Sequence, residues 1–265
     1  MLIVTADSSL LLGGDWWVEH AGEASRPLAP HRTGAAYLGA ANHDDPDYFE
    51  IALAAFDRAG FGRSKCRHIK ADASSADCAY VAGEAALIIL AGGDPMVAWD
   101  AFKATGIDVA LREAAGAGAV LTGVSAGAIN MGLYGVSAGA CPCLPDDTFQ
   151  TLGLLPFAFG AHEEADEWKG LLSLLSTVRA SSKTISGVGL PFRSGMAISG
   201  GTVRVASQKQ RILPSVILFE GEGCTSCCTE LPPGSEWKLV HTDCDADAEP
   251  EVRLIRVDAD AKMAW

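Results

Sequence analysis

The sequence predicts an α/β protein with a doubly wound, mostly parallel sheet, flanking helices and antiparallel strands toward the C-terminus. In the first half, short apolar runs alternate with segments of helical periodicity, a pattern typical of βαβ units. The run at 85–91 has strand length and contains no polar residue, as expected for a strand buried on both faces. In the second half, short β-like runs follow one another closely, which indicates antiparallel strands.

The first half contains five expected strands and three expected helices. The strands cover residues 2–6, 34–41, 66–71, 85–91 and 119–124. Two helices have clear starts, because Asp45-Pro46 and Asp94-Pro95 each combine a capping side chain with proline at the first helical position. The first of these helices is expected to end at Gly60 and the second at Gly106, where glycine can form the C-cap. A further helix is expected over 107–115.

The second half is expected to begin with a helix over 163–179 and to continue with strands. These strands cover residues 195–199, 202–206, 216–220, 237–240 and 252–257. Gly200-Gly201 between the first two predicts a hairpin. We expect the strands to extend the same sheet, so that residues 1–265 form a single domain. Residues 221–265 are a C-terminal extension whose structure the pattern does not define, with a Gly-, Cys- and Pro-rich loop at 221–235.

Composition and net charge indicate which partners and which cellular compartment to expect for this protein. A chain of 265 residues with 49% hydrophobic residues suits one large domain with a sizeable core. Its formal net charge of −13, without a dense Lys/Arg cluster, argues against nucleic acid and anionic membranes as partners. No apolar run approaches the roughly 18 residues of a membrane helix, and no signal peptide is recognisable. We therefore expect a cytoplasmic protein with reduced cysteines; association into a homo-oligomer is compatible with the sequence.

The hexapeptide GVSAGA occurs twice, at 123–128 and 135–140, and each copy contains Gly-x-Ser-x-Gly. This is the pattern of a nucleophile elbow, which requires a strand, a sharp turn and a helix in immediate succession. Ser125 follows the expected strand at 119–124 and precedes a segment that can begin a helix, whereas Ser137 has neither neighbour. Ser125 is therefore the candidate nucleophile. The alternative is a tight strand-to-helix turn built from small residues.

Two further features belong with the candidate nucleophile. The Gly92-Gly93 turn follows the preceding strand, and in a parallel sheet it lies at the same edge as Ser125. The amides of Gly93 and Ala126 could then converge as an oxyanion hole; simple packing of small residues is the alternative. His162 follows the apolar stretch 152–159 and is the candidate base, although a lone histidine is more often a surface or core residue.

Taken together, these motifs resemble the peptidase E and cyanophycinase family of serine peptidases. The resemblance rests on four segments in matching order and spacing: AGGDP (91–95), GAVLTGVSAGAINMG (118–132), TFQTLGLLPFAFGAH (148–162) and SGVGLPFRSGMAISGGTVRV (186–205). It implies a class I glutamine-amidotransferase-like fold, with Ser125 as nucleophile, His162 as base, and Gly93 and Ala126 as oxyanion donors. Relatives act on acidic dipeptides or on the aspartate–arginine polymer cyanophycin. The resemblance therefore implies a serine hydrolase of small peptide or isopeptide substrates that requires no cofactor for catalysis.

The chain departs from the family pattern in three ways, one of which is the run EEADEW after His162, where relatives typically carry basic residues. The acid that orients the base cannot be assigned by alignment, and we rank Asp147 and Asp146 first, Glu164 next and Glu163 last. Pro191-Phe192-Arg193 stands where relatives carry an acidic residue. These departures predict a substrate preference that differs from both named enzymes. They also keep a second interpretation open, a non-catalytic member of the fold that binds a small ligand or a partner protein.

The cysteines near the C-terminus suggest a metal site. Cys224, Cys227, His241 and Cys244 have the ligand types and approximate spacing of a four-coordinate zinc site. Such a site would be structural, because four protein ligands leave no open position. The alternative is a surface loop with reduced cysteines. Elemental analysis of protein purified without a metal-binding tag distinguishes the two, since a structural site should be close to fully occupied.

Overall fold

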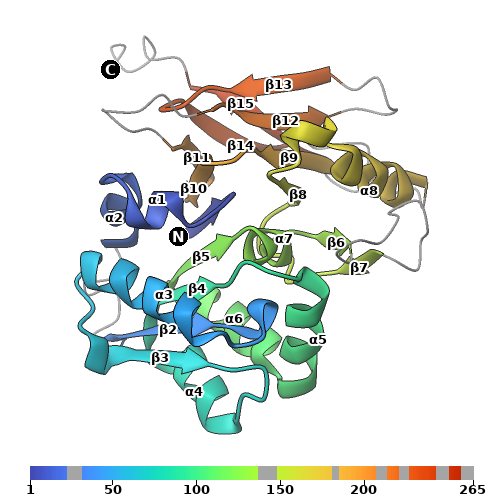
Figure 1. Ribbon diagram of the computed structural model, residues 1–265. Helices are drawn as coiled ribbons and strands as arrows, with labels where there is room; N and C mark the ends of the chain where they lie inside the picture. The colour runs from blue at the N-terminus through green and yellow to red at the C-terminus, as the bar shows by residue number, and fades with distance from the viewer. Residues whose placement is uncertain are drawn as a thin grey trace.

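The computed structural model describes residues 1–22, 32–136, 148–180, 185–206, 214–220, 227–242 and 251–257 (Figure 1). Strands in these ranges form a nine-stranded sheet, a four-stranded sheet and a two-stranded hairpin. Helices pack against these sheets and against one another. This arrangement confirms the predicted α/β class.

The nine-stranded sheet has the order β15-β14-β11-β10-β1-β5-β4-β2-β3. Its strands are β1 (Leu2–Thr5), β2 (Gly34–Leu38), β3 (Cys66–Ile69), β4 (Ala85–Leu90), β5 (Val120–Val124), β10 (Gly195–Ser199), β11 (Thr202–Val205), β14 (Glu236–Thr242) and β15 (Glu251–Arg256). On one side of β1, the neighbouring strands in the series β1-β5-β4-β2-β3 pair in parallel. On the other side, the neighbouring strands in the series β1-β10-β11-β14-β15 pair antiparallel. All carboxyl ends of the parallel half therefore lie at one edge, where ligands bind in such sheets.

The helices are α1 (Ser9–Leu12), α2 (Trp16–Ala21), α3 (Pro46–Arg58), α4 (Ser75–Gly83), α5 (Pro95–Thr105), α6 (Ile107–Gly116), α7 (Ala126–Met131) and α8 (Lys169–Ala180). Both predicted N-caps are confirmed: Asp45 accepts from the amide of Asp47, and Asp94 accepts from the amide of Met96. The sequence did not predict α1, α2 or α4. A capping box of Ser74 and Asp77 begins α4, and this was the overlooked signal.

A second sheet stands beside the large one, with the order β13-β12-β9-β8. It consists of β8 (Phe157–Ala161), β9 (Ser186–Leu190), β12 (Val216–Glu220) and β13 (Cys227–Leu231). Its inner face packs on α8 and forms a separate apolar cluster that includes Leu171, Leu175 and Phe219. Figure 1 shows α8 lying along this sheet. The expectation that 216–220 extends the large sheet was therefore wrong, because this second core buries that strand elsewhere.

Two other expectations for the second half were wrong. Residues 227–231 form β13 rather than part of a loop, since they complete the small sheet by pairing with β12. The helix expected from 163 begins only at Lys169, because Glu167 and Trp168 adopt positive φ values of 54° and 61° and cannot continue a right-handed helix. β6 (Tyr134–Val136) and β7 (Thr148–Gln150) form an additional hairpin.

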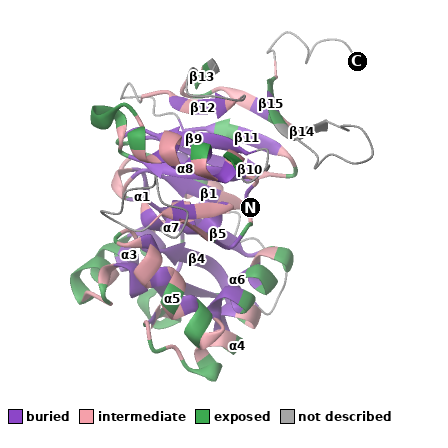
Figure 2. Cartoon of the chain, turned by 90° about the vertical axis from the view of Figure 1, so that its right-hand side faces the viewer, coloured by how far each residue is buried: buried purple, intermediate pink, exposed green. Residues whose placement is uncertain are grey.

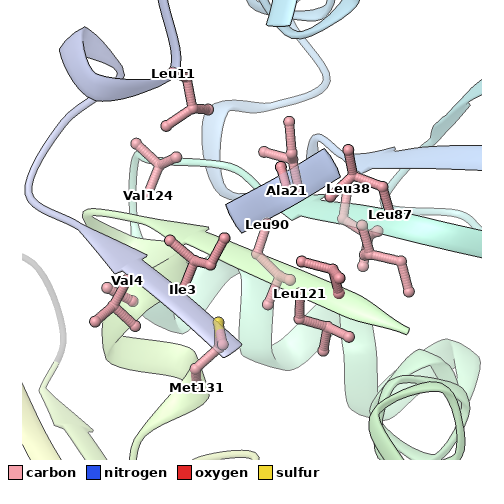
Figure 3. Packing of buried hydrophobic residues seen from close by; sticks show 14 of the residues in the cluster. Ile3, Val4, Leu11, Ala21, Leu38, Leu87, Leu90, Leu121, Val124 and Met131 are labelled. Atoms are coloured by element: carbon pink, nitrogen blue, oxygen red, sulfur yellow. The ribbon is translucent and has the colours of Figure 1, made fainter. Parts of the chain in front are cut away.

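The main core lies between the large sheet and its helices. Every residue of β4 is buried, as predicted, and Figure 2 shows the central strands buried along their length. Figure 3 shows Ile3, Leu90 and Leu121 packed close together on neighbouring strands. No helix in the described part of the chain is long and apolar enough to cross a membrane. The rigid parallel strands thus place the loops at their carboxyl ends, where the candidate residues lie.

Candidate active site

Ser125 lies in the sharp turn between β5 and α7. Its backbone has φ 49° and ψ −108°, outside the regions that L-residues favour, and its N–H donates to the carbonyl of Thr5 at 2.9 Å. A Cβ added at Gly123 would lie 2.6 Å from the carbonyl carbon of Gly127, and one at Gly127 would lie 2.8 Å from that of Leu90. Only glycine fits at both positions. The strand, strained turn and helix predicted around Ser125 are all present.

His162 follows the last residue of β8 and meets Ser125. The imidazole Nε2 lies 2.8 Å from the Ser125 Oγ, a distance typical of a hydrogen bond. His162 is exposed and its backbone is left-handed, with φ 46°. Its N–H donates to the carbonyl of Leu190 at 2.8 Å, which ties the turn to β9. The structure thus brings together two residues that the sequence singled out separately.

The Gly92-Gly93 turn lies next to Ser125, as expected for the end of β4. A Cβ added at Gly92 would lie 3.5 Å from the Ser125 Cβ, and one at Gly93, whose φ is 137°, would overlap the carbonyl of Ala41. The amide N–H groups of Gly93 and Ala126 donate to no acceptor among the described residues.

The two candidate orienting acids that the structure describes are engaged by backbone amides. Glu164 accepts from the N–H of Phe192 at 3.0 Å, and Glu163 accepts from the N–H of Leu171 at 3.0 Å. Burial raises the pKa of the Glu163 carboxyl above its ordinary value. Within the described ranges, no carboxylate hydrogen-bonds to the His162 ring.

The acids ranked first and part of the predicted zinc site lie outside the described residues. Asp146 and Asp147 belong to the segment 137–147, which also contains Ser137, so Asp147 stays a prediction. Cys224 and Cys244 are likewise outside the described ranges. Cys227 begins β13 and His241 lies in β14, in different sheets, and their side chains are not described. Zinc binding also stays a prediction.

Asp7 holds a turn at the edge of the Ser125–His162 site, and the sequence analysis did not identify it. It follows β1 and accepts from the N–H of Ser9 at 2.7 Å and from the N–H of Arg193 at 2.6 Å. The turn that it holds contains Phe192, which is 51% exposed, and Arg193, which has φ 68°. Because β9 ends beside His162, this turn lies at the edge of the Ser125–His162 site. An acid two residues after a parallel strand was the available signal.

Other histidines have contacts that explain them structurally. His68 stacks on Phe49 with ring centroids 4.7 Å apart, and its Nε2 lies 3.9 Å from a carboxylate oxygen of Asp44. His20 Nδ1 lies 2.7 Å from the carbonyl oxygen of Trp16. Among the described histidines, only His162 contacts a candidate nucleophile.

Two solved structures that resemble this chain in fold are described as peptidases. A peptidase from an acI-B1 Actinobacterium aligns with a TM-score of 0.65 and 16% identity, over 89% of this chain and 96% of its own. A candidate peptidase E protein from Listeria monocytogenes EGD-e aligns with a TM-score of 0.52 and 15% identity, over 78% of this chain and 98% of its own. At these identities the likeness shows the fold alone, that of an α/β protein with a large central sheet and flanking helices.

The family follows from the sequence itself. The sequence model of peptidase family S51 matches residues 9–206, a range that contains both Ser125 and His162. The chain belongs to peptidase family S51, and this membership supports a serine peptidase function. No curated protein matches the chain by sequence.

Proposed function

We propose that the protein hydrolyses peptide or isopeptide bonds with Ser125 as nucleophile and His162 as general base. The observation that carries this proposal is the 2.8 Å contact between Ser125 Oγ and His162 Nε2, at the end of a central strand of a family S51 fold. His162 removes the proton from Ser125 as Oγ attacks the substrate carbonyl carbon. The same imidazolium then gives this proton to the departing amine, leaving an acyl-enzyme that water hydrolyses by the reverse proton transfers.

The negative charge that develops on the carbonyl oxygen needs two preorganised donors. The N–H groups of Gly93 and Ala126 supply them in this proposal. Ala126 directly follows Ser125, and Gly93 directly follows Gly92, whose added Cβ would lie 3.5 Å from the Ser125 Cβ. Neither amide donates to a described residue. The Ala126 amide also opens α7, so the helix dipole adds a small favourable term. This chemistry needs no metal ion.

The substrate proposed is a small peptide or isopeptide, as for a dipeptidase E-like or cyanophycinase-like enzyme. The turn of Pro191-Phe192-Arg193 supports a substrate preference that differs from those of the two named enzymes. This turn puts an exposed aromatic ring and an arginine at the edge of the site. A panel of dipeptides and β-linked isopeptides that varies the residues on both sides of the scissile bond measures this preference.

Labelling with a fluorophosphonate probe tests the nucleophile. We expect the probe to label wild type and Ser137→Ala equally, because Ser137 lies in the second copy of the same hexapeptide and serves as a matched control. Ser125→Ala should lose labelling, and its turnover of the best panel substrate should fall by at least about 10⁴-fold. Labelling of Ser125→Ala at the wild-type rate would refute the assignment.

The second candidate function is ligand or partner binding without catalysis. It is favoured by the observation that no carboxylate among the described residues contacts the His162 ring. Absence of turnover over the whole panel, together with absence of labelling at Ser125, would make binding the better description.

A further inference from the structure

The residue after the proposed base carries a carboxylate that is fixed by a helix. Glu163 Oε2 accepts from the N–H of Leu171 at 3.0 Å, and the neighbouring amide of Gly170 also favours the ionised form of this carboxylate. These amides belong to the first turn of α8, where no intrahelical acceptor exists. Glu163 therefore caps α8 from a position outside the helix.

The space around this carboxylate is tight on two sides. A Cβ added at Gly170 would lie 2.8 Å from Glu163 Oε2, and one at Gly160 would lie 3.2 Å from Oε1. Gly160 is in β8 and Gly170 is in α8, so the Glu163 side chain fills the gap between a strand and a helix. Its position is determined by packing as well as by hydrogen bonds.

The backbone on both sides of His162 is held as a result. Before it, the His162 N–H donates to Leu190 in β9 at 2.8 Å; after it, the Glu163 carbonyl accepts from the N–H groups of Asp166 and Trp168 at 3.0 and 3.1 Å. A left-handed residue such as His162 persists only where its surroundings over-determine it. Releasing the Glu163 side chain would allow the turn to relax toward an ordinary conformation and to carry the imidazole away from Ser125.

We propose that Glu163 is a positioning residue: by capping α8 it holds His162 in the conformation that places Nε2 on the Ser125 Oγ. This inference rests on the proposed function of Ser125 and His162. It gives Glu163 a role different from that of a triad acid, because its carboxylate acts on the backbone of the turn and not on the imidazole ring.

Kinetics of Glu163 variants test the proposal, with Asp77→Ala as a matched control. Asp77 is also an acid that caps a helix, since it accepts from the N–H of Ser74 at 2.9 Å at the start of α4. We expect Glu163→Ala to lower kcat about 100-fold with little change in KM, because a displacement of about 1 Å costs a factor of this size. Glu163→Gln keeps one oxygen acceptor and should recover kcat to within about tenfold of wild type. Asp77→Ala should stay within about twofold.

A second measurement is independent of activity. Hydrogen exchange at the His162 amide, followed by NMR, should accelerate at least about tenfold in Glu163→Ala and remain unchanged in Asp77→Ala. Where Glu163→Ala does not fold, Glu163→Asp is measured in its place with the same expected acceleration, because its carboxylate is one methylene shorter and would no longer reach the Leu171 amide. If the wild type has no turnover, the proposed function fails and exchange alone decides whether Glu163 holds the turn. Unchanged exchange, or kcat of Glu163→Ala within about threefold of wild type, would overturn the proposal.

Discussion

The side chains of Ser125 and His162 meet although the two residues follow strands of different sheets. Different interactions hold the two turns in place. Ser125 ends β5 in the interior of the nine-stranded sheet, where Gly127 packs directly on the backbone of Leu90. His162 ends β8, the edge strand of the four-stranded sheet, and the turn after it is secured by the side chain of Glu163. Backbone packing constrains the turn at Ser125, whereas the Glu163 side chain and the His162 N–H constrain the turn at His162.

This difference predicts different responses to mutation on the two sides. Backbone atoms of a central strand cannot move without disturbing the whole core, so a clash at the nucleophile turn should reduce stability. A carboxylate at the end of a flexible side chain can move, so a clash at the histidine turn should reduce activity more than stability. The following changes test this distinction, beginning with the largest expected effect.

Substitution of Gly127 by alanine tests the nucleophile side. The new Cβ would overlap the carbonyl of Leu90, and Leu90 belongs to fully buried β4. We expect the free energy of unfolding, measured with urea, to fall by at least about 3 kcal/mol, the upper end of the usual cost of overpacking.

Gly83→Ala is the matched control for this substitution. Gly83 is also helical, in α4, but no atom lies within 4 Å of its added Cβ. It should be neutral or gain up to about 1 kcal/mol. A loss below about 1 kcal/mol in Gly127→Ala would show that the nucleophile turn is less constrained than the backbone contacts indicate.

Substitution of Gly170 by alanine tests the histidine side. Its Cβ would meet Glu163 Oε2 at 2.8 Å, and the carboxylate can rotate away at the expense of its hydrogen bonds to α8. Alanine also favours the helix by about 0.5–1 kcal/mol, so we expect the free energy of unfolding to stay within about 1 kcal/mol of wild type while kcat falls about tenfold. If Gly170→Ala instead lost about 3 kcal/mol or more, as expected for Gly127→Ala, the turns at Ser125 and His162 would not differ in the way described.

The pH dependence of stability isolates the buried acid on the histidine side. Burial raises the pKa of Glu163 above its ordinary value of 4.5, so the folded state binds this proton more tightly than the unfolded state. The stability that this proton contributes is complete below pH 4.5 and is lost as pH rises through the folded pKa. Wild type should therefore lose stability relative to Glu163→Gln over this range, with a slope of at most about 1.4 kcal/mol per pH unit. A difference between the two that is independent of pH would contradict the assigned burial effect.

Local signals in the sequence predicted the parallel half of the fold well. The apolar run of β4 and the capping residues Asp45 and Asp94 act within a few residues, and the structure has each as expected. The small sheet could not be predicted in the same way. Whether 216–220 pairs with β11 or with β9 depends on where α8 and Phe219 find a common core, which is a property of distant residues.

In the candidate site, too, local signals in the sequence indicated some residues and not others. The small residues around Ser125 indicated the turn because they are needed there for steric reasons. His162 was indicated by its place after an apolar strand. Asp7 and Glu163 gave little signal, since each acts on a backbone amide that the sequence does not identify. An acid that holds a main-chain turn resembles any surface carboxylate until the partner amide is known.

The connection between the two sheets has a mechanical consequence. The chain leaves β9 in the small sheet and enters β10 in the large sheet through a turn in which Ser194 donates to Pro191 and accepts from Ala6. Asp7 fastens the same turn through Arg193. The distance from Ser125 to His162 therefore depends on how the two sheets are aligned. A slip of about 1 Å along this seam would carry the 2.8 Å contact beyond hydrogen-bond reach with every strand intact. The Ser125–His162 contact could therefore be lost without unfolding of either sheet.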